Sequence, residues 1–266
     1  MRRNPQRSST PRSNSCYSGG MTQSTTATPR CDRASPAGCQ CFEHIQTWVF
    51  DLDNTLYPSS CDLFAQIDVK MTAYVGRLLG LPRDEARKLQ KQLYHKHGTT
   101  LAGLMSEYGI APKHFMDDVH DIDYSPVPHS PALVQALEAL PGRKVVYTNG
   151  SRDHALRVLD RLGTTHLFPE IFDIYDARFV PKPHDASFDS FLAQHAIEGA
   201  RAAMFEDLPQ NLLPAHARGM TTVLVHSHLD DHPVYKEIRT WGDAPPPHIH
   251  HRTDDLPEFL SRLAAA

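Results

Sequence analysis

The chain has 266 residues, of which 40% are hydrophobic, and carries a formal net charge of -4. A chain of this length can bury a sizeable core, as one large domain or two smaller ones. The mild charge, without clusters of Lys and Arg, argues against a protein that binds nucleic-acid polymers. No apolar stretch approaches the roughly 18 residues that a membrane helix needs, so we expect a soluble, cytoplasmic protein without a membrane partner.

Residues 1–44 are rich in Ser, Thr, Pro and Arg and poor in large apolar side chains. Such a segment cannot bury enough surface to offset its ordering entropy, and we expect a disordered tail. Before Asp32 the tail has no acidic residue, as in an organellar transit peptide, but it has no clear amphipathic helix and no secretory apolar segment. Met21 is an alternative start of the chain.

The five cysteines all lie in the first quarter of the chain, a placement and an odd number that make a poor disulfide framework. A reducing compartment is therefore the simpler interpretation. A zinc site built from the tail would not match the usual paired spacing. The zinc candidates are Cys31, Cys39, Cys41 and His44, and the two other cysteines are Cys16 and Cys61.

A short apolar run, Trp48-Val49-Phe50, opens the folded part of the chain and reads as a buried strand. From about residue 60 to 120 the sequence looks helical. Apolar side chains from Leu63 to Leu78 fall at helical spacing, and Gly80 with the following Pro82 ends that run. Further helices are expected over 84–97 and 99–108.

After Pro126, apolar strands and helices alternate. We expect strands at 144–147, 171–175, 202–205 and 221–225, and helices at 131–140, 152–162, 187–195, 210–218 and 255–263. This alternation indicates an α/β fold with a parallel sheet covered by helices on both faces. The helical block after the first strand is too long for a loop and predicts an inserted domain. We assign the core to 45–57 and 126–266, and an all-helical cap to 58–125.

Polar groups stand at or just after the predicted strand ends: Asp51 and Asp53, Thr148 and Asn149, Lys182, and Glu206 and Asp207. In parallel α/β sheets, ligands bind beyond the carboxyl ends of the strands, so we expect these groups to converge. Several carboxylates in a small space repel one another unless a cation compensates. Oxygen-only ligands favour a hard cation such as Mg²⁺.

The chemistry of phosphoryl transfer suits this set, because it needs a nucleophile and neutralisation of charge on the phosphoryl oxygens. Asp51 is the candidate nucleophile and Asp53 the candidate general acid and base. Thr148 can donate a hydrogen bond to the phosphoryl group, and Lys182 between two prolines supplies a positive charge. Alone, each motif is an ordinary turn, cap or surface feature; all four in this order are hard to attribute to chance.

These segments resemble the four signature motifs of the haloacid dehalogenase (HAD) superfamily. The matching strings are Phe50-Asp51-Leu52-Asp53-Asn54-Thr55-Leu56, Thr148-Asn149-Gly150, Pro181-Lys182-Pro183 and Phe205-Glu206-Asp207. The longer strings 50–57, 97–101, 147–152 and 205–212 resemble the pyrimidine 5'-nucleotidase-like branch. The resemblance implies a Rossmann-like core with a helical cap inserted after the first motif, and a phosphatase acting on nucleoside monophosphates.

The resemblance also implies roles for single residues. It makes Asp51 the nucleophile, Asp53 the acid and base, and Thr148 and Lys182 phosphoryl ligands. Mg²⁺ would be held by Asp51, Asp207 and the backbone carbonyl of Asp53, with Glu206 binding directly or through water. Dehalogenases of this type lack the second aspartate, so Asp53 favours hydrolysis of a phosphate ester over cleavage of a carbon–halogen bond.

The cap and the loops offer candidate substrate-binding residues: Thr99, Thr100, Asn149 and Arg152. His97, Thr99 and Thr100 sit in a polar break between helices that could face the site, although Thr99 or Thr100 could equally be a helix N-cap. Phe64 and Tyr94 could stack on a base or belong to the cap core.

Alternative functions stay open at this point. One is a sugar-phosphate phosphatase or a phosphomutase on the same scaffold, and a remote one is a phospho-acceptor signalling domain. A catalytically inactive binding protein is a third, although no expected catalytic position is missing. The histidine groups 226, 228 and 232, and 248, 250 and 251, read as surface or strand-edge residues rather than a metal site.

Overall fold

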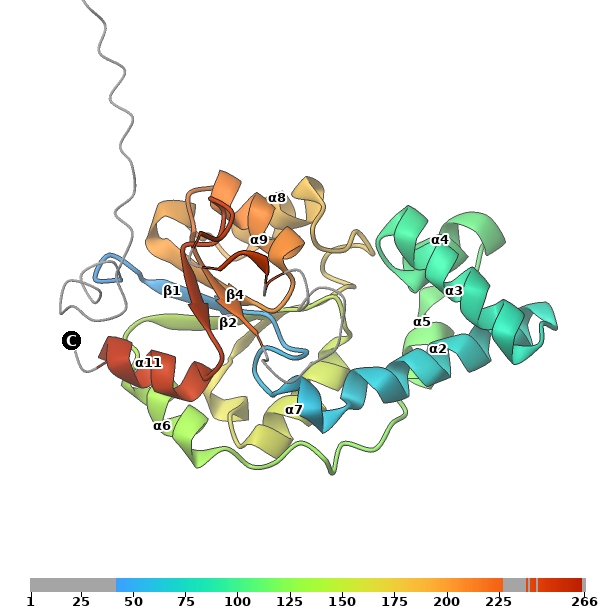
Figure 1. The fold of residues 1–266 in the computed structure, drawn as a ribbon, viewed down its shortest axis with the longest axis horizontal. Helices are drawn as coiled ribbons and strands as arrows, with labels where there is room; N and C mark the ends of the chain where they lie inside the picture. The colour runs from blue at the N-terminus through green and yellow to red at the C-terminus, as the bar shows by residue number, and fades with distance from the viewer. Residues whose placement is uncertain (1–41, 227–237, 239, 243, 265–266) are drawn as a thin grey trace, which may run out of the picture.

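A six-stranded parallel sheet forms the centre of the protein, as seen in a computed structural model that describes residues 42–226, 238, 240–242 and 244–264. The strand order is β3-β2-β1-β4-β5-β6 (Figure 1). The predicted α/β fold with a parallel sheet is confirmed. The strands are β1 (Thr47–Phe50), β2 (Arg143–Tyr147), β3 (Glu170–Phe172), β4 (Ala202–Glu206), β5 (Thr221–Val225) and β6 (His251–Thr253).

Helices cover both faces of this sheet (Figure 1). Helices α6 (Pro131–Ala139), α7 (Arg152–Leu162) and α11 (Leu256–Ala264) pack on one face, and α8 (Asp185–Gln194) and α9 (Pro209–Ala217) on the other. Three short 3₁₀ turns lie at Ser59–Cys61, Thr165–Leu167 and Gly199–Arg201. Parallel strands need such crossover helices, so both faces of the sheet become buried.

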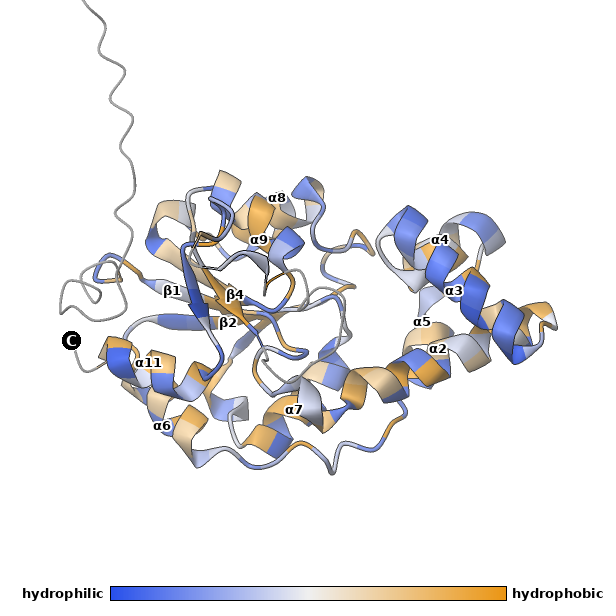
Figure 2. Cartoon of the chain, viewed as in Figure 1, coloured by the Kyte–Doolittle hydropathy of each residue, from blue (hydrophilic) through white to orange (hydrophobic). Residues whose placement is uncertain are grey.

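Strand β1 shows why the core strands read as continuous apolar runs. All four of its residues are buried. Trp48 and Phe50 point into the hydrophobic cluster on one face of the sheet, and Val49 points into the cluster on the other. The ring of Phe50 stacks on that of Phe205 in β4, with centroids 4.7 Å apart. Figure 2 shows β4 as largely hydrophobic, while the helices carry hydrophilic residues on their outer sides.

Four helices between β1 and α6 form a separate bundle beside the sheet, at the right of Figure 1. They are α2 (Leu63–Leu79), α3 (Arg83–His97), α4 (Thr100–Tyr108) and α5 (Pro112–Val119). The bundle has its own hydrophobic cluster, which includes Val75, Leu93 and Phe115. Ile174, a buried member of this cluster, comes from the loop after β3.

The structure corrects three of the sequence expectations. Strand β3 ends at Phe172 rather than residue 175, because the Asp173 carboxylate accepts the backbone N–H groups of Tyr175 and Asp176 and turns the chain. Strand β6 was not predicted, since a three-residue strand reading His-Arg-Thr has no apolar run. Phe42, assigned to the tail, is 6% exposed and packs on Trp48 and Phe259.

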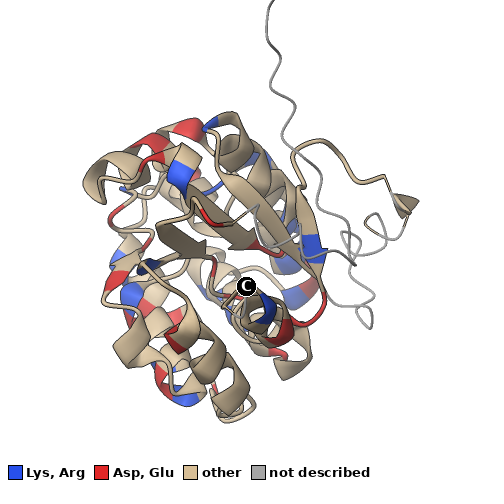
Figure 3. Ribbon diagram, turned by 90° about the vertical axis from the view of Figure 1, so that its left-hand side faces the viewer, with Lys and Arg blue, Asp and Glu red and all other residues tan. Residues whose placement is uncertain are grey.

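Several expectations concern residues outside the described part of the chain. These include the disorder of residues 1–41, the tail cysteines, and two of the histidines, His228 and His232. Cys61 is buried with a free thiol, His44 is exposed, and His251 lies in β6. None of the described helices is long and apolar enough to cross a membrane. Acidic and basic residues are interspersed along the helices (Figure 3).

Candidate active site at the carboxyl edge of the sheet

Lys182, from the third motif, contacts residues of the first and fourth motifs and the backbone directly before the second. Its ammonium group donates to Asp51 Oδ1 at 2.6 Å, to Glu206 Oε1 at 2.9 Å and to the backbone carbonyl of Tyr147 at 2.9 Å. Asp51 follows β1, Glu206 ends β4, and Tyr147 ends β2, three neighbouring strands. The predicted convergence at the carboxyl edge of the sheet is therefore present. Lys182 is 2% exposed, so this ion pairing is almost fully shielded from water.

Three buried carboxylates, those of Asp51, Glu206 and Asp207, place an oxygen each within 4.8 Å of one another. The ammonium group of Lys182 forms ion pairs with two members of this cluster, Asp51 and Glu206. Burial together with the charges of Glu206 and Asp53 raises the pKa of Asp51 to about 7, despite the opposing charge of Lys182. Burial and the charges of Glu206 and Asp51 raise the pKa of Asp207 as well.

Burial and the mutual repulsion of the carboxylates both disfavour their ionised forms, and a nearby positive charge would oppose this effect. A hard divalent cation with oxygen ligands would supply such a charge, and the donor set and spacing fit Mg²⁺. The protein holds Glu206 through both of its carboxylate oxygens: Oε1 accepts from Asn211 Nδ2 and Oε2 from the backbone N–H of Leu208, each at 2.6 Å.

Asp53, two residues after Asp51, faces a different environment. Its Oδ1 accepts a hydrogen bond from the Tyr57 hydroxyl at 2.6 Å and another from His154 Nε2 at 2.8 Å. Burial would raise the pKa of Asp53, but the charge and hydrogen bond of His154, with that of Tyr57, outweigh it and lower the pKa to about 2. The two aspartates of the first motif thus have pKa values displaced in opposite directions.

The second motif, after β2, positions both its own turn and the lysine. The Thr148 hydroxyl, 1% exposed, accepts the backbone N–H of Gly150 at 2.9 Å. The Asn149 amide exchanges two hydrogen bonds with the backbone of Lys182, donating to its carbonyl and accepting its N–H. Asn149 therefore orients the loop that presents Lys182, a positioning contact that the sequence did not indicate.

The polar break between α3 and α4 lies beside the Lys182 loop. Gly98, with φ +81°, lies close to Pro181: a Cβ built on it would be 3.4 Å from the proline ring. Thr99 is the N-cap of α4, and its side chain accepts the backbone N–H of Ala102. This contact agrees with the N-cap interpretation of the sequence. Thr100 is buried. His97 Nε2 contacts Glu107 at 2.7 Å.

Two aromatic candidates on the cap helices are exposed rather than in the cap core. Phe64 is 46% exposed and Tyr94 is 40% exposed. Burial, followed by the charges of Asp207 and Glu206, raises the pKa of Tyr94.

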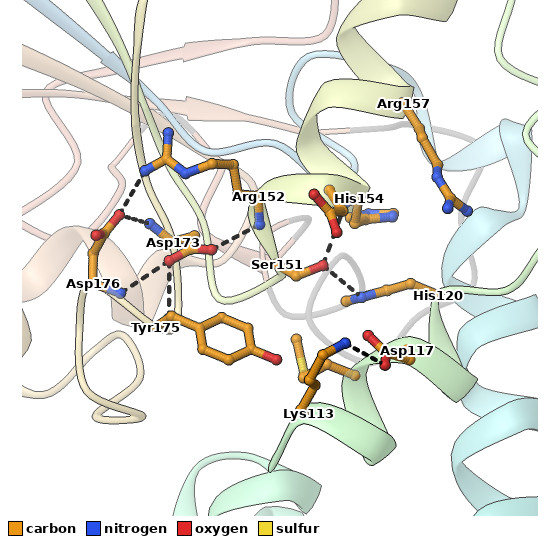
Figure 4. Close-up of a pocket in the computed structure, with 12 residues that line it drawn as sticks. Lys113, Asp117, His120, Ser151, Arg152, His154, Arg157, Asp173, Tyr175 and Asp176 are labelled. Atoms are coloured by element: carbon orange, nitrogen blue, oxygen red, sulfur yellow. Dashed lines mark hydrogen bonds and ion pairs between the residues drawn. The ribbon is translucent and has the colours of Figure 1, made fainter.

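Arg152, a candidate substrate ligand, is engaged elsewhere in the structure. Its guanidinium donates to the Ile171 carbonyl at 2.6 Å and to Asp176 at 2.8 Å, and its backbone N–H donates to Asp173. It lines an open cleft of about 470 Å³ between α5 and the start of α7. Figure 4 shows this cleft, with His154 on its wall.

The sequence did not single out some residues that hold the site together. Thr55 donates to Asp51 Oδ2 at 3.0 Å, and it lies, like Tyr57 and Asn211, within strings that carried the family resemblance. His154 had no comparable signal. It follows Asp53 by 101 residues and looks like one more polar residue of an amphipathic helix.

Comparison with protein families gives the class. The family model of haloacid dehalogenase-like hydrolases matches residues 45–219, about two thirds of the chain. The chain therefore belongs to the haloacid dehalogenase-like hydrolase family. This membership argues against the remote alternative considered from the sequence, a phospho-acceptor signalling domain.

Two curated relatives are each 27% identical over 197 residues. One is Phosphate metabolism protein 8 of Saccharomyces cerevisiae, where the match covers 67% of this chain and 61% of the yeast protein. The chain thus spans less than two thirds of that relative. The other is Glyceraldehyde 3-phosphate phosphatase of Methanothermobacter thermautotrophicus, with 68% of this chain and 86% of the archaeal protein covered.

Solved structures share the fold. The L-2-haloacid dehalogenase of Xanthobacter autotrophicus superimposes with a TM-score of 0.50 at 17% identity, covering 84% of this chain and 99% of that one. A putative HAD hydrolase of Bacillus subtilis, crystallised with magnesium, gives 0.51 at 14% identity, covering 82% and 98%. At these identities the comparison supports the fold alone.

Proposed function

We propose that this chain is a magnesium-dependent phosphatase that transfers the phosphoryl group of a small phosphate ester to Asp51 and then to water. One observation carries the proposal. Asp51 is buried beside Lys182 and the Glu206–Asp207 pair, while a second aspartate, Asp53, stands two residues away. The arrangement combines a nucleophile, a positive charge for the phosphoryl oxygens and an acid–base group.

The reaction would run in two steps. An Asp51 oxygen attacks phosphorus, the P–O ester bond breaks with its electron pair on the leaving oxygen, and Asp53 gives that oxygen a proton. Asp53 then takes a proton from water, whose oxygen attacks the phosphorus of the acyl-phosphate. The P–O bond to Asp51 breaks, and inorganic phosphate leaves with Asp51 restored.

Each of the other residues has a proposed task in these steps. Lys182 and the Thr148 hydroxyl hold the phosphoryl oxygens, and Thr55 orients Asp51 through Oδ2. Asp51, Asp207 and the backbone carbonyl of Asp53 would bind Mg²⁺, with Glu206 directly or through water. When bound, the ion neutralises charge on the phosphoryl group.

The acid role of Asp53 depends on the bound ester. A pKa of about 2 keeps Asp53 ionised at neutral pH in the free protein. A phosphate dianion beside this carboxylate would raise its pKa, because a nearby like charge disfavours the ionised form. Asp53 is thus expected to take up a proton as the substrate binds.

We propose nucleoside monophosphates as the first substrate class, on the resemblance of the longer sequence strings to pyrimidine 5'-nucleotidases. The helices α2–α5 would act as a cap over the site, with Tyr94 available for a base. Triose and sugar phosphates are the second class, favoured by the archaeal relative named for glyceraldehyde 3-phosphate.

A phosphate-release screen tests the proposal. Purified protein is given UMP, CMP, purine monophosphates, glyceraldehyde 3-phosphate and hexose phosphates, with Mg²⁺ or with EDTA. We expect Mg²⁺-dependent release that falls at least about a hundredfold in Asp51→Asn. Full activity in chelator would refute the metal assignment, and unchanged turnover in Asp51→Asn would refute the nucleophile. The ranking of the esters decides between the two substrate classes.

A further inference from the structure

His154 is completely buried and has a partner at each ring nitrogen. Nε2 lies 2.8 Å from Asp53 Oδ1, and Nδ1 lies 2.9 Å from the Tyr124 hydroxyl. Since an ionised carboxylate can only accept, Nε2 donates to Asp53. The ring thus has one fixed position in the first turn of α7.

The two oxygens of the Asp53 carboxylate differ in consequence. Oδ1 accepts from both His154 and Tyr57, whereas Oδ2 has no hydrogen-bond partner within the described ranges. Oδ2 lies on the side of the Thr148 turn, 3.8 Å from where a Cβ on Gly150 would stand. Two donors on one oxygen fix the carboxylate plane and leave the other oxygen available for proton transfer.

The segment that connects the cap helices back to the sheet holds His154 in turn. His120, directly after α5, stacks on the His154 ring with centroids 4.4 Å apart and an angle of 13° between the rings. Its Nδ1 lies 3.0 Å from the Ser151 hydroxyl, a contact visible in Figure 4. Tyr124 contacts both the His154 ring and the carbonyl of His120.

These contacts join the acid–base group to both chain connections between cap and core. Tyr57 belongs to the connection from β1 to α2, and His120 and Tyr124 belong to the connection from α5 to α6. A rotation of the α2–α5 bundle about these connections would move the groups that orient Asp53.

We propose that His154 is a positioning residue for Asp53: held by Tyr124 and His120, it turns Oδ2 toward the leaving oxygen of the substrate. The inference rests on the proposed phosphatase function. It assigns His154 no contact with substrate or metal. Its effect is on the proton transfer alone, which gives it a kinetic signature that a general loss of structure does not have.

The test compares two esters that differ in their need for a proton. p-Nitrophenyl phosphate has a stable leaving anion, whereas an alkyl phosphate cleaved in the screen above needs protonation of its leaving oxygen. The constant kcat/KM covers only the steps up to departure of the leaving group, so it excludes the later hydrolysis of the acyl-phosphate. General acid catalysis contributes about 10²- to 10⁴-fold.

In His154→Leu we expect kcat/KM for the alkyl ester to fall at least about tenfold more than kcat/KM for p-nitrophenyl phosphate, with the alkyl-ester KM nearly unchanged. Tyr124→Phe keeps the ring packing and should show the same selectivity at about threefold. If the His154→Leu variant does not fold, the Tyr124→Phe variant alone tests the proposal. Tyr74→Phe, a buried tyrosine within the cap cluster, is the matched control and should leave the ratio unchanged.

The outcomes separate this inference from the proposed function. If the variants lose activity equally on both esters, or lose none, His154 does not position the acid and the inference fails while the phosphatase stands. If the wild-type protein cleaves neither ester, the proposed function fails and the inference with it.

Discussion

Lys182 shows at the scale of one residue how a buried charge is tolerated. Its ammonium group has three oxygen partners within 2.9 Å, and these include two carboxylates. Burial would lower the pKa of Lys182, but the charges of Asp51 and Glu206 raise it instead. Removing either partner of such a buried pair leaves an uncompensated charge, which is strongly destabilising.

The pKa of Asp51 gives a prediction for stability without metal. The pKa of Asp51 is about 7 in the folded state and about 3.9 in the unfolded state. Between these two pH values the folded state holds a proton that the unfolded state has lost. The contribution of Asp51 to the free energy of unfolding is fully present at low pH. It is lost as pH rises toward 7, by on the order of 1 kcal/mol per pH unit.

Denaturant unfolding in EDTA at pH 5, 6, 7 and 8 measures this loss. The difference between wild type and Asp51→Asn reports Asp51 together with groups whose pKa it shifts, such as Asp207, because groups that do not interact with Asp51 titrate alike in both proteins. We expect the wild type to lose stability relative to the variant up to pH 7, and added Mg²⁺ to restore it. A pH-independent difference would contradict the prediction.

At the scale of elements, the loop after β3 links the sheet to the cap helices. Asp173 ends the strand by accepting two backbone N–H groups, and this turn directs Ile174 away from the sheet. Ile174 is 2% exposed inside the hydrophobic cluster of α2–α5, and Phe179 packs against the same cluster. The cap helices are thereby anchored by a segment that is not part of either chain connection.

Truncation of this anchor should be costly. Ile174→Ala removes a buried aliphatic side chain, and we expect a loss of about 3 kcal/mol in the free energy of unfolding. Urea denaturation followed by circular dichroism measures it. Leu213→Ala on α9, where the side chain is 49% exposed, is the control and should cost less than about 0.5 kcal/mol. Equal losses in the two variants would show that Ile174 is not an anchor.

At the scale of the whole molecule, the sheet edge carries the candidate site, and the bundle α2–α5 lies beside the loop that presents Lys182. The carboxylates come from the ends of β1 and β4 and the ammonium group from the Lys182 loop, while Gly98 of the helical bundle approaches Pro181 of that loop. Under the proposed function, the sheet edge would carry the chemistry and the helical bundle the substrate choice, and we expect the two to respond separately to mutation.

Tyr94 tests this separation. If it stacks on a nucleobase, Tyr94→Ala should raise KM for UMP about two- to tenfold, with little effect on KM for glyceraldehyde 3-phosphate, which has no base. Tyr108→Ala on α4 is a matched control, since both tyrosines are 40% exposed. A rise of KM that is equal for the two esters would assign Tyr94 to general closure of the site instead of base recognition.

The sequence by itself determined the α/β class and the convergence of the charged motifs. Apolar runs such as Trp48–Phe50 mark buried parallel strands, and polar residues directly after them must meet at one edge because the strands are parallel. The same local logic failed for β6, whose three residues carry no apolar pattern, and for the end of β3, which a side-chain turn decides.

Only the tertiary structure decided which side chains orient the reactive ones. The contact of His154 with Asp53 spans 101 positions, and that of Asn149 with Lys182 spans 33. Neither contact leaves a trace in local periodicity, because a hydrogen bond between distant residues depends on how helices and loops pack. The sequence thus points to the candidate reacting groups, while their orientation arises from packing around the sheet edge.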